Sequence, residues 1–345
     1  MLRVGLIGCG TIGRAHSLSL WALRKAGLTD AAVVAVADPD ADRAGSIAQP
    51  NGAEVMGIAE VLGSVDVVYV GTPTATHEAI VEAAAARGLA IYCEKPLGPD
   101  LDSARRVAAL LKTVPHQVGL ALRSAPVFAA MEQAIRSGRY GRLMTVILRD
   151  DQYFPIQGAY ASSWRSDVAL SGGGTLIEHS IHDLDLFRWL CGDPERVACR
   201  TSSFFGYPGI EDFAATTLSF ADGATGALTS IWHQVLSRGS TRRVEVFCEE
   251  AFLWTEDDNT GPLHVQTSAG TEVIACDPPS WVDEIPVPEA GRRTLGLYAE
   301  ASRRFLASIE AGSAGSPGEG EALAAHVLVD AAYRSAASGG RPVQP

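Results

Sequence analysis

The sequence predicts an α/β protein, with an N-terminal doubly wound parallel sheet and a C-terminal α+β domain built on a large, mostly antiparallel open sheet. Three observations support this prediction. Short apolar runs alternate with helical segments in the first third of the chain, a glycine-rich turn follows the first run, and strand-like segments succeed one another in the second half. The chain has 345 residues, more than one core usually supports, so we expect two domains, 1–122 and 123–345.

The first predicted domain consists of apolar runs separated by helices. Helices cover both faces of a parallel sheet, so its strands are continuous apolar runs rather than alternating ones. The expected strands are 3–7, 31–37, 65–70, 89–94 and 117–121. The expected helices between them are 11–25, 40–48, 77–87 and 101–112.

The second predicted domain opens with a helix at 126–137 and a strand at 143–149. One helix is expected from 175 to 190. Strand segments then follow without intervening helices, which favours antiparallel pairing, at 196–205, 212–221, 224–235, 242–248, 251–255, 263–267 and 271–276. Two helices, 294–311 and 319–338, end the chain.

Composition limits the partners and the compartment. The formal net charge of −12 at pH 7 argues against a nucleic-acid-binding face and against binding to anionic membranes. The six cysteines form no C-x-x-C pair, so free thiols in a reducing cytoplasm are the simplest interpretation. No apolar stretch approaches the roughly 20 residues of a membrane span. We therefore expect a cytoplasmic protein that binds a small molecule.

The turn after the first strand has the pattern of a dinucleotide site. Glycines at positions 8, 10 and 13 lie between a predicted strand and a predicted helix, where they permit a tight turn, close approach of a pyrophosphate and close helix packing. Asp38 ends the second strand, where it can accept hydrogen bonds from a ribose and would repel a 2′-phosphate, so NAD is favoured over NADP. The cofactor residues expected here are Gly8, Gly10, Thr11, Ile12, Gly13 and Asp38.

A polar loop follows the third long apolar strand. Its residues Thr72, Pro73, Thr74 and His77 would line the same carboxyl-end crevice and contact the cofactor. The structural alternative is that Thr74 caps the next helix and His77 only supports the fold. Both interpretations can hold together.

Glu94-Lys95-Pro96 closes the next apolar run. Pro96 cannot donate to a strand ladder, so the strand ends there. A charged pair at the end of a buried strand is costly unless it faces a cleft or a partner. Lys95 is therefore a candidate for catalysis, with Glu94 positioning it or facing the cofactor; a surface ion pair is the alternative.

The segment 172–185 carries the second candidate cluster. Glu178 and His182 are four residues apart and would share a helix face, the arrangement of a general acid–base histidine beside a carboxylate. Acidic residues that favour the helix dipole are an equally good explanation. A metal site formed with His179 and Asp185 is a further alternative, although we expect no metal.

Several motifs resemble the glucose–fructose oxidoreductase/inositol dehydrogenase (Gfo/Idh/MocA) family, namely those at 8–13, 72–77, 94–96, 172–185 and 332–339. The resemblance covers essentially the whole chain. It implies an NAD(P)-binding Rossmann domain, a substrate and oligomerisation domain, and NAD(P)-dependent oxidation or reduction of sugars, cyclitols and related polyols. It also implies that Lys95 and His182 are catalytic. Glu178 stands where inositol dehydrogenase-like members have Asp, and His179 where the family often has a small or apolar residue.

These residues suggest a hydride transfer between a secondary alcohol and NAD. His182 would exchange the hydroxyl proton, Lys95 would stabilise the alkoxide, and Glu178 would hold or tune His182. The remaining substrate-binding candidates are Arg123, Trp164, Arg165 and His179.

Two broader expectations concern assembly and competing functions. An exposed face of the C-terminal sheet would find a partner, so a homodimer or homotetramer is expected. A ligand- and NAD(P)-sensing protein without turnover remains the first alternative function, and a metal-assisted lyase or hydrolase the second.

Overall fold

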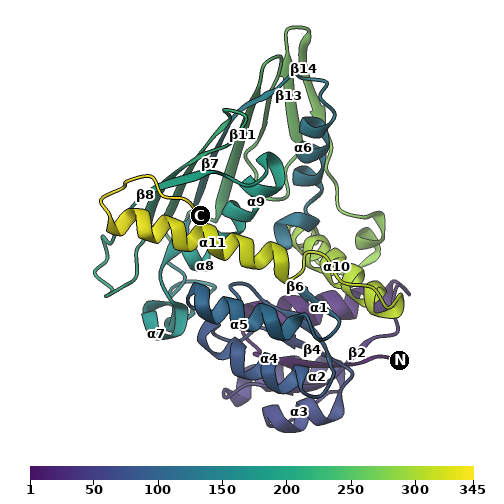
Figure 1. Cartoon of the computed structure of the whole chain (residues 1–345). Coiled ribbons are helices and arrows are strands. Elements are labelled where there is room, and N and C mark those ends of the chain that lie inside the picture. The colour runs from purple at the N-terminus through teal and green to yellow at the C-terminus, as the bar shows by residue number, and fades with distance from the viewer. The chain divides into compact units, whose positions relative to one another are not determined.

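A computed structural model describes residues 1–345, apart from the side chains of residues 289 and 290. The chain divides into two compact units, labelled by element in Figure 1. The first unit comprises residues 1–124 and 278–323, and the second comprises residues 125–277 and 324–345. The two domains predicted from the sequence, 1–122 and 123–345, stay a prediction.

The first unit is built on a six-stranded parallel sheet with the strand order β3-β2-β1-β4-β5-β6. This doubly wound order confirms the predicted fold of the N-terminal half. The strands are β1 Arg3–Ile7, β2 Ala32–Ala37, β3 Glu54–Val55, β4 Val67–Val70, β5 Ala90–Cys93 and β6 His116–Val118. The α-helices are α1 Thr11–Lys25, α2 Ala41–Asn51, α3 Ile58–Ser64, α4 His77–Ala85, α5 Leu101–Leu111 and α10 Glu289–Glu310.

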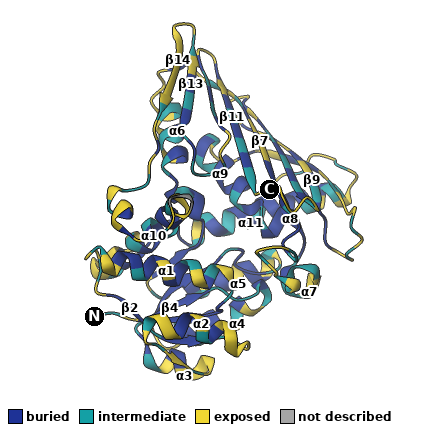
Figure 2. Ribbon diagram, turned by 180° about the vertical axis from the view of Figure 1, so that it is seen from behind, coloured by how far each residue is buried: buried dark blue, intermediate teal, exposed yellow. Residues whose placement is uncertain are grey.

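Both faces of this sheet are covered, as continuous apolar strands require. Every residue of β4 and β5 is buried, which Figure 2 shows in dark blue for β4. One core cluster joins the sheet to α4 and α5 through residues such as Val81 and Val107. The cluster on the other face includes Leu20 of α1 and Phe305 of α10. The segment 278–323 belongs to this unit because α10, which lies within that segment, packs into this cluster.

The second unit is built on an eight-stranded sheet with the order β14-β13-β12-β11-β7-β10-β9-β8. All neighbours are antiparallel except β7 and β10, so the predicted mostly antiparallel sheet is confirmed. Its strands are β7 Leu143–Tyr153, β8 Arg196–Ser202, β9 Phe213–Ser219, β10 Thr225–His233, β11 Thr241–Cys248, β12 Phe252–Thr255, β13 Leu263–Thr267 and β14 Gly270–Ile274. Its helices are α6 Pro126–Arg136, α7 Val168–Ser171, α8 Thr175–Glu178 and α9 Ile181–Cys191; α11 Glu319–Ala337 crosses the boundary between units.

The single helix predicted at 175–190 is wrong. The chain forms α8 and α9 with a break at His179 and Ser180, where His179 adopts φ −120° and ψ −61°. Tertiary contacts explain the break, because the Ser180 hydroxyl donates to Ser230 Oγ of β10 at 2.6 Å. Glu178 and His182 are therefore not successive turns of one helix.

Two general findings complete the fold. None of the helices in the described part of the chain is both long and apolar enough to cross a membrane. All six cysteines are free thiols, and five of them are buried.

Candidate functional site

The glycine-rich turn after β1 is held by close backbone contacts. Gly8 has φ +95°, and a Cβ there would lie 2.5 Å from the Gly71 carbonyl oxygen. A Cβ at Gly13 would collide with the carbonyl oxygen of Gly8. Side chains are excluded at both positions by the protein's own backbone, so these two glycines are required for the fold of the turn.

Gly10 differs from its neighbours, because a Cβ there would meet nothing within 4 Å. It is the N-cap of α1, and no side chain caps this helix end or places an acidic group in its first turn. Open backbone amides at a helix N-terminus attract an anion such as a pyrophosphate. Thr11 and Ile12 begin the helix at this point, so the turn fits the predicted dinucleotide.

Asp38 lies directly after β2 and joins the glycine turn. Its Oδ2 accepts the Cys9 amide hydrogen bond at 2.7 Å, and its Oδ1 accepts that of Asp40 at 2.8 Å. Each carboxylate oxygen can accept more than one hydrogen bond, so capacity remains for ribose hydroxyls. Asp38 therefore shapes the turn as well as being a candidate ribose ligand.

His77 connects the two other polar loops at the carboxyl end of the parallel sheet. Its ring nitrogens lie 2.8 Å from the Pro96 carbonyl oxygen and 3.0 Å from that of Thr72. The ring is buried, and α4 begins with it after the 3-10 turn Thr74–Thr76. Thr72 Oγ1 accepts a hydrogen bond from Thr76 at 2.7 Å. His77 thus ties the Thr72-Pro73 loop to the Glu94-Lys95-Pro96 segment.

Glu94 is oriented by a residue that the sequence analysis did not identify. His16 of α1 lies with Nε2 2.8 Å from Glu94 Oε1, and both side chains are buried. Glu94 Oε2 accepts the backbone N–H of Lys95 at 3.3 Å. The rings of Tyr69 and Tyr92 flank His16, at centroid distances of 5.1 and 4.8 Å. The backbone at Lys95 is thereby fixed to the first helix.

In the second unit, the structure brings three predicted residues together. Arg165 donates from Nε to Glu178 Oε2 at 3.1 Å, and its guanidinium carbon lies 4.2 Å from the Trp164 ring centroid. Glu178 is only 3% exposed. A buried carboxyl group needs such a partner, so Arg165 holds the Glu178 side chain in place.

His179 and His182 lie on either side of Ser180, at the break between α8 and α9. His179 Nε2 lies 2.7 Å from Oδ2 of Asp150, a fully buried residue of β7. His182 is in the first turn of α9 and is partly exposed. Asp183, the next residue, accepts a hydrogen bond from Arg242 Nε at 2.6 Å. Arg123, the remaining substrate candidate, lies in the 3-10 turn Ala121–Ser124 of the first unit.

Glu211 and Tyr333 support the glycine-rich entry to α8. Glu211 accepts the backbone N–H groups of Gly174 and Leu176 at 2.8 and 2.9 Å, and the Tyr333 hydroxyl donates to it at 3.0 Å. Burial raises the pKa of Glu211, while these donors oppose the rise. A Cβ at Gly174 would collide with the Glu211 carbonyl oxygen, so the close approach requires glycine.

Asp150, Asp183 and Arg242 are not among the predicted site residues, although the sequence contains a signal for Asp150 and Arg242. On β7, Val146, Leu148 and Asp150 occupy alternate buried positions, and Arg242 continues the alternating buried residues of β11 in the same way. A charged residue that completes a buried apolar column requires a buried partner.

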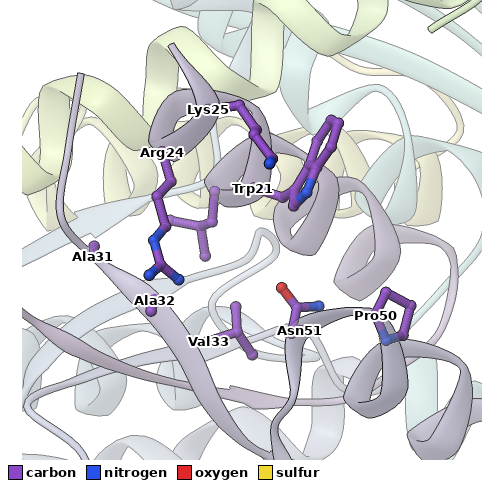
Figure 3. A pocket seen from close by; sticks show the side chains of 9 residues that line it. Trp21, Arg24, Lys25, Ala31, Ala32, Val33, Pro50 and Asn51 are labelled. Atoms are coloured by element: carbon purple, nitrogen blue, oxygen red, sulfur yellow. The ribbon is translucent and has the colours of Figure 1, made fainter. Parts of the chain in front are cut away.

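The alternative metal site gains no geometric support. Among the residues described, no group of three or more His, Cys, Asp or Glu side chains is arranged to hold an ion. A separate cavity of about 440 Å³ lies at the amino end of β2, where Arg24 reaches from α1 toward Ala32 (Figure 3). No predicted site residue lines it.

Comparison with known proteins assigns the family. Residues 2–121 match the model described as "Oxidoreductase family, NAD-binding Rossmann fold", and residues 128–254 match "GFO/IDH/MocA C-terminal domain". The chain belongs to the Gfo/Idh/MocA family of oxidoreductases. It is 32% identical over 350 residues to an inositol 2-dehydrogenase of Rhizobium meliloti, covering 97% of each protein. It is also 32% identical over 231 residues to 1,5-anhydro-D-fructose reductase of Ensifer adhaerens, covering 65% of this chain and 67% of that protein.

Solved structures agree with this assignment. A putative myo-inositol dehydrogenase from Sinorhizobium meliloti 1021 is 28% identical, with a TM-score of 0.79 over 100% of this chain and 99% of that one. Levoglucosan dehydrogenase in complex with NADH and L-sorbose shares the fold, with a TM-score of 0.88, 23% identity, and coverage of 100% and 98%. The predicted family, enzyme class and NAD cofactor are confirmed. The individual site residues stay predictions.

Proposed function

We propose that this protein is an NAD-dependent oxidoreductase that transfers a hydride between nicotinamide and a secondary alcohol or ketone carbon of a polyol, such as a sugar or cyclitol. The observation that carries the proposal is the match to an inositol 2-dehydrogenase over 97% of the chain. Lys95 and His182 lie in motifs that resemble those of the family, and Glu178 stands where inositol dehydrogenase-like members have Asp.

The cofactor is proposed to bind at the glycine turn of the first unit, with its pyrophosphate at the N-terminus of α1 and its ribose at Asp38. The uncapped helix end and the open space at Gly10 support this placement. The Asp38 carboxylate favours NAD over NADP because it would repel a 2′-phosphate. When bound, nicotinamide supplies the hydride acceptor or donor. The other cofactor contacts are proposed for Gly8, Thr11, Ile12, Gly13, Thr72, Pro73, Thr74, His77, Glu94 and Lys95.

Three side chains are proposed to handle the proton and the developing charge. His182 takes the hydroxyl proton during oxidation and returns it during reduction. The Lys95 ammonium stabilises the alkoxide that forms as the proton leaves. Glu178 orients His182 or a substrate hydroxyl, and Arg165 holds the Glu178 side chain in place.

The substrate is proposed to contact Arg123, Trp164, Arg165 and His179. The guanidinium stacked on Trp164 presents a planar donor beside an apolar ring face, a combination that suits a polyhydroxylated ring. His179 adds a ring that can donate or accept hydrogen bonds next to Glu178. Because this residue type is uncommon at the position in the family, it is proposed to contribute to substrate choice.

The decisive experiment follows NADH absorbance with a panel of cyclitols and sugars. Wild-type protein is expected to reduce NAD with at least one polyol, and Lys95→Ala to lose about 10²- to 10³-fold in kcat. NADH binding to the variant should be retained. Normal turnover by Lys95→Ala would contradict the assigned role, and NADH binding without turnover of any polyol would favour a sensing protein.

The assembly is proposed to be a homodimer or homotetramer through the C-terminal sheet. Side chains that point away from its covered face include Ile147, 41% exposed, and Phe247, 37% exposed. The Phe247, Phe252 and Trp254 rings stack in succession, with centroids 4.6 and 4.7 Å apart. Such an apolar row is stabilised by a second copy, and sedimentation of Phe247→Asp against wild type tests it. A cytoplasmic location is proposed from the free thiols.

A further inference from the structure

A buried charge centre lies next to the α8–α9 break. It consists of Arg242 on β11, Asp150 on β7, Asp183 on α9 and Asp258 in the loop after β12. Arg242 is 3% exposed, and Asp150 and Asp183 are fully buried. Charges are removed from water at high cost, so a site of this kind persists only where the partners are matched closely.

The Arg242 guanidinium uses each of its nitrogens on a different carboxylate. Nε donates to Asp183 at 2.6 Å, Nη2 donates to Asp150 at 2.9 Å, and Nη1 donates to Asp258. The sheet register supports this arrangement, because Arg242 lies directly opposite Asp150 in the β7–β11 pair. Because the guanidinium is planar and each of its three nitrogens binds a different carboxylate, it fixes the positions of all three carboxylates.

The same centre holds the chain on both sides of His182. Asp183 is the residue after His182, and Asp150 also lies 2.7 Å from Nε2 of His179. The break at His179 and Ser180 lies between these points, so no continuous helix fixes the orientation of His182 relative to Glu178. The charge centre replaces that missing constraint.

Burial raises the pKa of both Asp150 and Asp183, while the Arg242 guanidinium opposes the rise. Arg242 pairs with both, and the His179 ring faces Asp150 from the α8 end. Asp183→Asn keeps an oxygen that can accept the hydrogen bond from Arg242 Nε and removes only the charge. Asp183→Ala abolishes this contact.

We infer that Arg242 is a positioning residue for the segment carrying Glu178, His179 and His182, and that it acts through Asp150 and Asp183. The inference rests on the proposed function for its activity readout. Arg242 touches neither the substrate nor the cofactor in this account. We expect Arg242 to set the orientation of His179 and His182 toward a substrate.

The first test compares Arg242→Lys with Arg188→Met as control. Lysine keeps the buried charge but cannot donate to three carboxylates as the guanidinium does. Arg188 is a suitable control because it pairs with Asp193 near the other end of α9. Arg242→Lys is expected to bind NADH normally and lose about 10²-fold in kcat, the effect of misplacing a catalytic group by about 1 Å. Arg188→Met should match wild type. A folded Arg242→Lys protein with wild-type kcat overturns the inference.

The second test compares Asp183→Asn with Asp183→Ala. Asn should retain kcat and Ala should lose it with little change in KM for the polyol; equal kcat losses overturn the inference. Hydrogen exchange over 178–185 provides a readout without turnover, and should be faster in Arg242→Lys and Asp183→Ala than in Arg188→Met. Unchanged exchange also overturns it. If wild type turns over no polyol but the exchange result holds, the proposed function fails and the positioning inference stands.

Discussion

Gly10→Ala separates cofactor binding from folding more cleanly than any other change in the glycine turn. Gly10 has φ −73° and ψ −161°, a conformation open to any L residue. A Cβ there meets nothing within 4 Å. The change should therefore leave the fold intact and, by restricting the unfolded chain, stabilise it by about 0.4–1 kcal/mol.

The cost should appear only when the dinucleotide binds. If the pyrophosphate approaches the backbone at Gly10, the added methyl group occupies its space and removes a hydrogen bond to a charged acceptor. Such a bond contributes about 1.5–3 kcal/mol, which corresponds to about 10- to 150-fold weaker NADH binding. Titration of NADH fluorescence measures this loss, and thermal unfolding measures the stability.

Two matched variants make the result interpretable. Gly45→Ala in α2 also meets nothing within 4 Å, so it should stabilise the protein by a similar amount and keep the NADH affinity. Gly13→Ala should destabilise the protein itself, because its Cβ collides with the Gly8 carbonyl oxygen. If Gly10→Ala binds NADH as tightly as wild type, the pyrophosphate does not approach this residue and the assigned cofactor site is incorrect.

Three further predictions concern the supporting contacts. Gly174→Ala should destabilise the protein by about 3 kcal/mol or more in urea unfolding, whereas Gly239→Ala, with open space around its Cβ, should not. His16→Leu should cost about 1–3 kcal/mol because it leaves Oε1 of the buried Glu94 side chain without its hydrogen-bond partner; an unchanged stability would show that Glu94 is not held by His16. Burial raises the pKa of Asp183 from 3.8 to about 7 against the opposing pull of Arg242. The folded state therefore holds this proton more tightly than the unfolded state. The associated stability, at most about 4 kcal/mol, is complete below about pH 4 and disappears as the pH rises through 7. Asp183→Asn should flatten that part of the pH–stability curve, and an unchanged slope would contradict the assignment.

The glycine turn could be predicted because its information is local. Three glycines, a preceding apolar run and Asp38 all belong to one strand–helix–strand unit, and each constraint acts between neighbours in space that are also near in sequence. The strands of the second unit were also predictable, since alternation along each strand records which face is covered. Their order was not, because β7 pairs with β10 and β11 across long connections.

The break between α8 and α9 could not be predicted in this way. Periodicity from Thr175 to Leu190 suits a single helix, and nothing nearby in the sequence indicates that Ser230 or Glu211 will compete for its backbone and side chains. Local propensity was overridden by contacts 35 to 50 residues distant in sequence. The family motif predicts Glu178 and His182 as site residues, but it did not predict the break in the backbone between them.

Asp38, Glu94 and Glu178, the carboxylates predicted as site residues, each already have a hydrogen-bond partner within the protein. Asp38 accepts the Cys9 amide, Glu94 contacts His16, and Glu178 accepts from Arg165. Each is thus a structural acceptor before any cofactor or substrate binds, and alanine substitution would remove both roles at once. An isosteric amide keeps an oxygen for the structural donor while removing the charge. Loss of activity in the amide variants with retained stability would therefore report on chemistry, whereas loss in the alanine variants alone would report on the scaffold.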